Sequence, residues 1–294
     1  MVVIVEEATM PKNASRDSVK AKLRESIDYC NSHHLPVQPL FESLVDELIT
    51  ERTCRYDPEF RVTEMKALFP ILFQERTRGM IPSIPLPESA ISLASDEFLR
   101  LWLSKWVQKF LAEWKSLPGD HQADSKRTVT DPALLQMVMA SSHAGDLDTA
   151  MVWAAHHNLY MSAENAGGNL LEEYIANKIA PYGWVWCRGK IITAVDFCND
   201  ACTAMFQVKN KTNTENSSGK GFREVVGVQV WCRMRAERRA GQIETYWPKL
   251  VEIVRSGATR GGAVPDDLMT EDDYLAFVRA VSENNPYLIS AEEN

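Results

Sequence analysis

The segment ITAVDFCNDACTAMFQVKNKTNTENSS, residues 192–218, contains two short apolar runs with polar residues at regular positions. Asp196 lies at the end of the first run. Gln207, Lys209 and Lys211 occupy alternate positions in the second run. Successive side chains of a strand point to opposite faces, so these three are expected on one face. The ten residues between Asp196 and Gln207 allow a turn, which predicts the aspartate on the adjacent strand.

This arrangement brings together a carboxylate, an amide oxygen and an ammonium group. Oxygen atoms are the ligands that Mg²⁺ prefers, so Asp196 and Gln207 are candidate metal ligands. A bound Mg²⁺ polarises a phosphate and acidifies a water molecule, and Lys209 can orient that water. The three residues therefore indicate metal-assisted hydrolysis of a phosphodiester.

A further acid is needed because the amide of Gln207 contributes no charge. In GGNLLEEYIANKI, residues 167–179, a helical wheel at 100° per residue places Glu172 at the edge of the apolar arc and Glu173 on the opposite side. Glu172 is therefore preferred over Glu173 as the third metal ligand. Glu215 is a second candidate for this role.

The order of secondary structure predicts an α/β (α+β) protein. The first half has helical spacing of apolar residues, and helices are expected again over 145–160 and 167–183. Three short strands are expected next, over 184–190, 191–197 and 203–211, because these runs are rich in β-branched and aromatic residues. VVGVQVWCRMRAERR, residues 225–239, is ambiguous between strand and helix, and helices follow it.

Two features suggest how the chain is divided. A polar stretch with Pro118, Gly119 and Pro132 indicates a linker, which predicts a mainly helical region over 1–128 and a second region over 129–294. Before this stretch, aromatic residues recur every fourth position of one predicted helix, namely Phe98, Trp102, Trp106, Phe110 and Trp114. Such a ridge is expected in a core or a subunit interface.

The charge distribution is uneven. The formal net charge is -8, yet residues 186–239 contain ten basic and five acidic residues, a net +5. A basic strip on an acidic protein fits a surface that contacts phosphates, although a solvated face is an alternative. Polar residues able to contact bases or phosphates follow Lys209 closely, and the candidates for DNA binding are Lys211, Asn213, Thr214, Glu215, Asn216, Ser217, Ser218, Lys220, Arg223 and Arg233.

Composition also bears on location and redox chemistry. No signal peptide and no apolar run of membrane-spanning length is found, which predicts a cytoplasmic protein without membrane contact. The six cysteines do not form a disulfide framework. The close pair Cys198 and Cys202 lacks the usual zinc-knuckle spacing, so packing as small apolar residues is expected.

Asp196, Gln207 and Lys209 resemble the catalytic positions of the PD-(D/E)XK nucleases, with Gln207 in place of the usual acid. Together with GNLLEEYIANKI, WVWCRGKIITAVDF, FQVKNKTNTENSS and YLAFVRAVSENNPYLI, the chain over 130–294 resembles the SinI-type restriction endonucleases. The resemblance implies a mixed central β-sheet flanked by helices and a glutamate on the helix before the strands. It also implies a type II enzyme that uses Mg²⁺ to cut double-stranded DNA at GGWCC, leaving 5′-phosphate ends. A homodimer and a cognate DNA methyltransferase are expected with it.

Two other functions remain open from the sequence. Gln207 in place of an acid favours a DNA-binding protein without catalytic activity. A modification-dependent endonuclease, which cuts only methylated DNA, is a third alternative that the residues do not exclude.

Overall fold

The computed structural model describes seven stretches of the chain, residues 12–49, 55–73, 80–121, 131–141, 146–212, 227–237 and 243–289. Contacts divide the chain into two compact units. Unit 1 comprises residues 1–115, 187–195 and 219–227, and unit 2 comprises residues 116–186, 196–218 and 228–294. The predicted boundary at residue 128 falls outside the described residues and stays a prediction.

Unit 1 is helical in its described residues. Its elements are α1 (Arg16–Ser32), α2 (Val37–Ile49), α3 (Pro58–Leu68), η1 (Phe69–Phe73), η3 (Glu88–Ser92), α4 (Ser95–Glu113) and η6 (Arg188–Lys190). Helix α4 packs against α1, α2 and α3, so it forms the centre of the unit. The prediction of a mainly helical first half is confirmed.

The aromatic ridge of α4 and the residue that follows the helix are inside this core. Phe98, Trp102, Trp106, Phe110 and Trp114 are each at most 3% exposed. The indole Nε1 of Trp106 donates to the backbone carbonyl of Ile191 at 3.1 Å. This buried N–H group therefore has the hydrogen-bond partner that it needs. The ridge is therefore core, and it presents no exposed aromatic surface to another subunit.

Unit 2 contains the sheet. Its elements are η4 (Pro118–Asp120), α5 (Pro132–Ser141), α6 (Leu147–Ile179), η5 (Ala180–Tyr182), β1 (Trp184–Trp186), β2 (Phe197–Asn199), β3 (Met205–Lys211), β4 (Gln229–Met234), α8 (Trp247–Gly257) and α9 (Glu271–Asn284). The strand order is β1-β2-β3-β4. The first two pairs are antiparallel and β3–β4 is parallel, so the predicted mixed sheet flanked by helices is confirmed.

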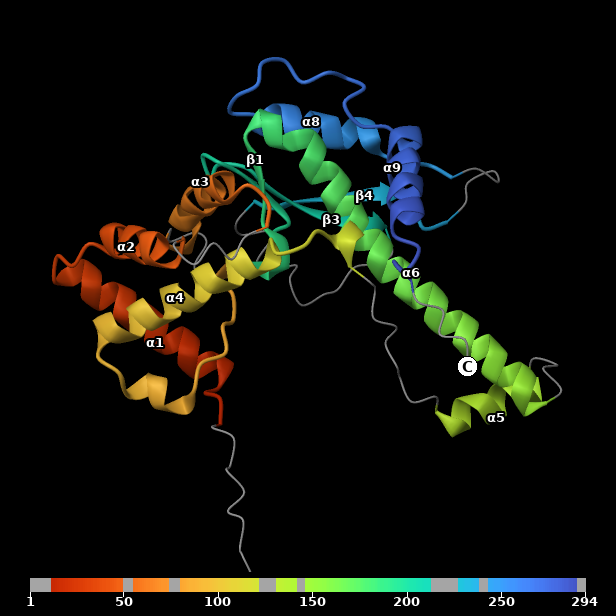
Figure 1. Cartoon of the computed structure of the whole chain (residues 1–294), viewed down its shortest axis with the longest axis horizontal. Helices are drawn as coiled ribbons and strands as arrows, with labels where there is room; N and C mark the ends of the chain where they lie inside the picture. The colour runs from red at the N-terminus through yellow and green to blue at the C-terminus, as the bar shows by residue number, and fades with distance from the viewer. Residues whose placement is uncertain are drawn as a thin grey trace, which may run out of the picture. The chain divides into compact units, whose positions relative to one another are not determined.

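Helix α6 is one continuous element of 33 residues, whereas the sequence predicts two separate helices, so that prediction is wrong. Gly167 and Gly168 lie inside the helix, where each costs about 1 kcal/mol relative to alanine. Burial of Ala166, Leu170 and Leu171 beside them outweighs this cost. Figure 1 shows α5 beside the N-terminal end of α6, away from the sheet. Neither α6 nor any other helix among the described residues combines the length and apolar content needed to span a membrane.

One face of the sheet is covered by an aromatic cluster. The ring centroids of Phe206 and Trp184 are 5.0 Å apart, and Trp231 of β4 lies 5.1 Å from Trp247 of α8. Tyr174 of α6 extends the cluster, with its ring 5.6 Å from that of Trp247. Residues 225–239, ambiguous from their sequence, thus provide a strand because Trp231 is buried in this cluster.

Asn199 fixes the turn between β2 and β3. It is 1% exposed, and its Oδ1 accepts the backbone N–H groups of Thr203 (2.8 Å) and Ala204 (3.1 Å). Its Nδ2 donates to the carbonyl of Gly257 at 2.9 Å. The side chain therefore holds the hairpin that brings β2 and β3 together.

We predict that Asn199→Ala lowers the free energy of unfolding by about 2–4 kcal/mol, because several buried polar groups lose their partner. Urea denaturation followed by circular dichroism measures this change. Asn177→Ala, at an exposed position of α6, is the matched control and is expected to change stability by less than about 0.5 kcal/mol. Equal stability of both variants would contradict the assigned role of Asn199.

Candidate active site

Asp196 precedes β2 instead of ending a strand, so the predicted strand over 191–197 is wrong in its position. Ile191, Ile192 and Val195 are at most 2% exposed but lie in a turn, in which Ala194 has a φ of 62°. A left-handed residue interrupts strand geometry, and the apolar run is buried as a turn. Burial of an apolar run therefore did not require pairing as a strand.

Asp196 is bonded directly to β3. Its backbone N–H donates to the carbonyl of Phe206 at 3.1 Å, and its carboxylate Oδ2 accepts the N–H of Val208 at 2.7 Å. The prediction that Asp196 lies beside the strand of Gln207 and Lys209 is thus confirmed. The carboxylate sits at the backbone between Gln207 and Lys209.

Strand β3 has the predicted alternation. Phe206 and Val208 are buried, whereas Gln207 and Lys209 are partly exposed. In the parallel pairing with β4, Gln207 lies opposite Val230, which is 39% exposed. The face with the two polar residues is therefore open to solvent at β4, while the opposite face belongs to the aromatic core.

Burial raises the pKa of the Asp196 carboxyl to about 6, although the hydrogen bond from Val208 and the positive charge of Lys209 both act to lower it. Attraction between Asp196 and Lys209 requires that the two side chains lie close together. Asp196 and Lys209 of the predicted site are therefore close enough for the charge of the lysine to affect the pKa of the aspartate.

The two glutamates of α6 have different surroundings. Glu172 is partly exposed, and its Oε2 accepts the indole N–H of Trp186 at 3.0 Å. Glu173 is 6% exposed, and its Oε2 accepts the backbone N–H of Gly119 at 3.0 Å. The indole holds one oxygen of Glu172, whereas Glu173 stabilises the segment before α5.

The described residues contain no group of three or more His, Cys, Asp or Glu side chains placed to hold a metal ion. A donor set here would instead combine Asp196 with the amide oxygen of Gln207. The Oδ1 atom of Asp196 has no hydrogen-bond partner within the described stretches, in contrast to Oδ2. Cys198 and Cys202 are buried, as expected for small apolar residues.

The candidates for DNA binding are distributed unevenly. Lys211 is partly exposed at the end of β3, and its Nζ contacts Oε1 of Glu164 on α6 at 2.9 Å. The candidates in the polar segment after β3 lie outside the described residues, namely Asn213, Thr214, Glu215, Asn216, Ser217, Ser218, Lys220 and Arg223. Its role, including that of Glu215 as a metal ligand, stays a prediction.

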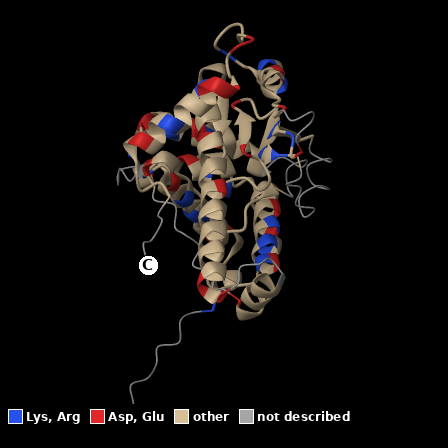
Figure 2. Ribbon diagram, turned by 90° about the vertical axis from the view of Figure 1, so that its right-hand side faces the viewer, with Lys and Arg blue, Asp and Glu red and all other residues tan. Residues whose placement is uncertain are grey.

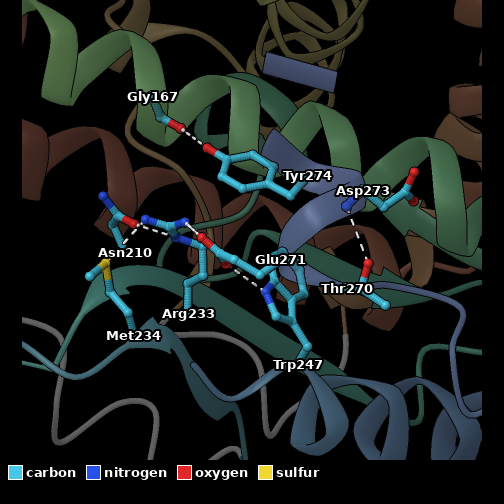
Figure 3. A network of polar contacts seen from close by, with 9 residues as sticks. All are labelled: Gly167, Asn210, Arg233, Met234, Trp247, Thr270, Glu271, Asp273 and Tyr274. Atoms are coloured by element: carbon cyan, nitrogen blue, oxygen red, sulfur yellow. Dashed lines mark hydrogen bonds and ion pairs between the residues drawn. The ribbon is translucent and has the colours of Figure 1, made fainter. Parts of the chain in front are cut away.

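Arg233 is held inside a network of polar contacts (Figure 3). Its Nε donates to Oδ1 of Asn210 at 2.9 Å, and a terminal nitrogen donates to Glu271 at 2.5 Å. The other oxygen of Glu271 accepts the indole N–H of Trp247 at 2.7 Å, and the guanidinium lies 5.0 Å from the ring centroid of Tyr274. Arg233 thereby joins β3 to α9, and it would have to leave these partners to bind a phosphate.

The sequence does not indicate that Trp186 binds Glu172 or that Glu271 binds Arg233. The sequence pattern predicts Trp186 only as a residue of the strand over 184–190, and it gives Glu271 no role. The tryptophan itself indicates a hydrogen-bond acceptor nearby, because a buried indole N–H needs one. In the structure the acceptor is Glu172.

We predict a pH-dependent stability difference between the parent and Asp196→Asn. Since the carboxyl has a folded-state pKa of about 6 against an ordinary 3.8, the folded chain retains a proton that the unfolded chain releases between these values. The contribution of Asp196 to the free energy of unfolding therefore falls as the pH rises through this window.

Asp196→Asn keeps an acceptor for Val208 but cannot ionise. It is expected to equal the parent in stability near pH 4 and to exceed it by about 1–3 kcal/mol at pH 7. Urea denaturation across this pH range, without divalent cations, measures the difference. A difference that does not vary with pH would show that Asp196 is not the group responsible.

Comparison with known proteins identifies relatives of this segment. Residues 114–258 match the family described as SinI restriction endonuclease, so the resemblance stated from the sequence is confirmed over 130–258, whereas 259–294 lie outside this match. The type II restriction enzyme Eco47I of Escherichia coli is 37% identical over 127 residues, which are 42% of this chain and 49% of that protein. The type II restriction enzyme SinI of Salmonella infantis is 39% identical over 128 residues, 42% of this chain and 50% of that protein. The chain thus spans about half the length of these curated relatives.

Proposed function

We propose that this protein is a type II restriction endonuclease, a hydrolase that cuts phosphodiester bonds of double-stranded DNA. The observation that carries the proposal is the carboxylate of Asp196 bonded to the backbone of β3 beside Lys209. These residues lie within the segment 114–258 that matches the restriction endonuclease family. The mixed sheet with three consecutive strands after a long helix supports the PD-(D/E)XK superfamily as its class.

The proposed cofactor is Mg²⁺, held by Asp196, Gln207 and Glu172. The donors fit this ion because all three offer oxygen atoms, and Oδ1 of Asp196 has no other partner among the described residues. When bound, the ion supplies polarisation of the scissile phosphate and a more acidic water. The indole of Trp186 donates to the Glu172 carboxylate at 3.0 Å and would limit the positions that this side chain can take.

The chain's own groups have distinct tasks in this scheme. Asp196 has to be ionised to bind a cation, and Lys209 favours that ionised form. The Lys209 ammonium also orients the attacking water and stabilises charge that develops on the phosphate oxygens. Water would attack phosphorus opposite the 3′ oxygen, and the P–O3′ bond would break; the 3′ oxygen takes up a proton, which leaves a 5′-phosphate and a 3′-hydroxyl.

DNA recognition is assigned to the end of β3 and the segment after it. Lys211 would exchange Glu164 for a DNA phosphate, and the polar side chains of 213–223 would enter a groove. Arg233 is proposed to contact a phosphate only after release from Glu271. The resemblance suggests GGWCC as the target, and this near-palindrome suits a two-fold homodimer with one site for each strand.

A cell that contains such an enzyme has to protect its own DNA. A cognate methyltransferase that modifies the same target is therefore part of the proposal. Access to DNA also implies that the protein works in the cytoplasm, in line with the sequence expectation.

A second candidate function is a DNA-binding protein without catalysis. Gln207 favours it, because an amide contributes no negative charge to the metal site. A modification-dependent endonuclease would share the site but would require methylated DNA. Both alternatives predict no cleavage of unmethylated plasmid.

We predict that the parent cuts unmethylated plasmid of mixed sequence in Mg²⁺, and that Lys209→Ala lowers the cleavage rate by about 100-fold or more. Gel analysis of digestion over time measures the rate, and sequencing of the fragment ends gives the target and the end chemistry. Lys249→Ala, at an exposed lysine of α8, is the matched control and should cut at the parent rate. Binding without scission of either unmethylated or methylated plasmid would overturn the proposal in favour of the binding protein, and scission of methylated plasmid alone would favour the modification-dependent endonuclease.

We also predict that Gln207→Glu lowers the Mg²⁺ concentration for half-maximal cleavage by about tenfold, because a carboxylate adds charge to the donor set. Gln207→Met, which removes the oxygen donor, should raise that concentration. Titration of cleavage rate with Mg²⁺ separates the variants. An unchanged titration in both would remove Gln207 from the metal site.

A further inference from the structure

The outer part of unit 2 presents an unusual apolar surface. Here, the arm denotes α5 (Pro132–Ser141) together with residues 147–163 of α6, which pack on each other. Large apolar side chains of the arm are between 37% and 72% exposed, namely Leu134, Met137, Leu147, Met151, Val152, Trp153, Leu159, Tyr160 and Met161. They occur on several sides of α6, because Met151, Val152 and Trp153 point about 100° apart.

The arm has a single charged residue, Asp148, at the start of α6. Residues 149–163 contain no Asp, Glu, Lys or Arg, and no Lys or Arg occurs from 131 to 177. In Figure 2, where this part faces the viewer, the lower length of the long helix is accordingly tan. A helix that faces water normally has a charged side, whereas one that is apolar on all sides is normally buried. DNA is not a suitable partner, because binding a polyanion requires basic side chains.

The exposed area suits a protein partner of defined size. With about 150 Å² for each large side chain, half exposure of these nine residues leaves on the order of 700 Å² to bury. A stable interface takes about 800 Å² from each partner. The arm alone therefore supplies most of one side of such an interface.

We propose that the arm binds the same arm of a second copy of this chain. The two α5–α6 pairs would form a four-helix contact around a two-fold axis, with each arm offering the same patch. Charge is compatible with this occupant, since the uncharged segment 149–163 meets its own copy without repulsion. The acidic residues that flank the uncharged segment, Asp146, Asp148 and Glu164, lie at its ends.

This inference deepens the homodimer of the proposed function, and it rests on that function for the expected two-fold symmetry. It replaces the aromatic ridge of α4 as the subunit interface, since that ridge is buried within unit 1. The surface is defined by the exposed apolar side chains of the arm and by its uncharged segment 149–163. It can be tested without DNA or metal, so its failure is separable from failure of the nuclease proposal.

The test is sedimentation equilibrium of the full chain with a matched pair of variants. Tyr160→Glu places a charge at a residue of the arm that is 72% exposed, and Tyr287→Glu makes the same change at 71% exposure outside it. The parent and Tyr287→Glu should be dimers, and Tyr160→Glu should raise the dimer Kd by about 100-fold or more. Circular dichroism confirms that each variant is folded.

Met151→Glu is a second arm variant that keeps a good helix former, and the same loss of dimer is expected. Hydrogen exchange provides a measurement that needs no substitution. Amides of residues 147–163 should exchange more slowly at high than at low parent concentration, while those of α9 should not change. A monomeric parent, or a dimer that persists in both arm variants, would overturn the proposal.

Discussion

The hydrogen bond from the Val208 N–H to the carboxylate of Asp196 determines how the candidate site is assembled. It ties a carboxylate from one segment to the backbone of the strand that carries Lys209, at 2.7 Å. Without this bond, the aspartate would be a partly buried charge on a loop, and burial would favour its protonated form. With it, and with Lys209 nearby, ionisation stays within reach of neutral pH.

The alternation of β3 separates two environments that the proposed function needs. Phe206 and Val208 anchor the strand in the aromatic cluster with Trp231, so the backbone is held firmly. Gln207 and Lys209 project to the other face, which is open beside Val230. A rigid strand with one dry and one accessible face can position polar groups accurately. The Arg233–Glu271 pair reinforces this arrangement from the side of α9.

Much of the fold and the core of the site followed from local patterns. Period-two spacing in β3 and the buried ridge of α4 agree with the expectation from local patterns, whereas the mixed sheet agrees with what the family resemblance implied. The errors arose where packing overrode local signals. The pattern predicts that a second helix begins at Gly167, but α6 is continuous through Gly167 and Gly168, with buried residues on both sides of them. Residues 191–195 had strand composition, but they are buried as a turn.

The sequence by itself determined which residue types carry the chemistry and that Gln207 and Lys209 share a face, because alternation is a property of any strand. It also determined the family resemblance. Only the tertiary structure decided that Asp196 accepts the N–H of Val208, that Trp186 holds Glu172, and that Glu271 binds Arg233. These partners are separated by 12 to 38 residues, and such contacts depend on how the strands and helices pack, which no local pattern of residues specifies.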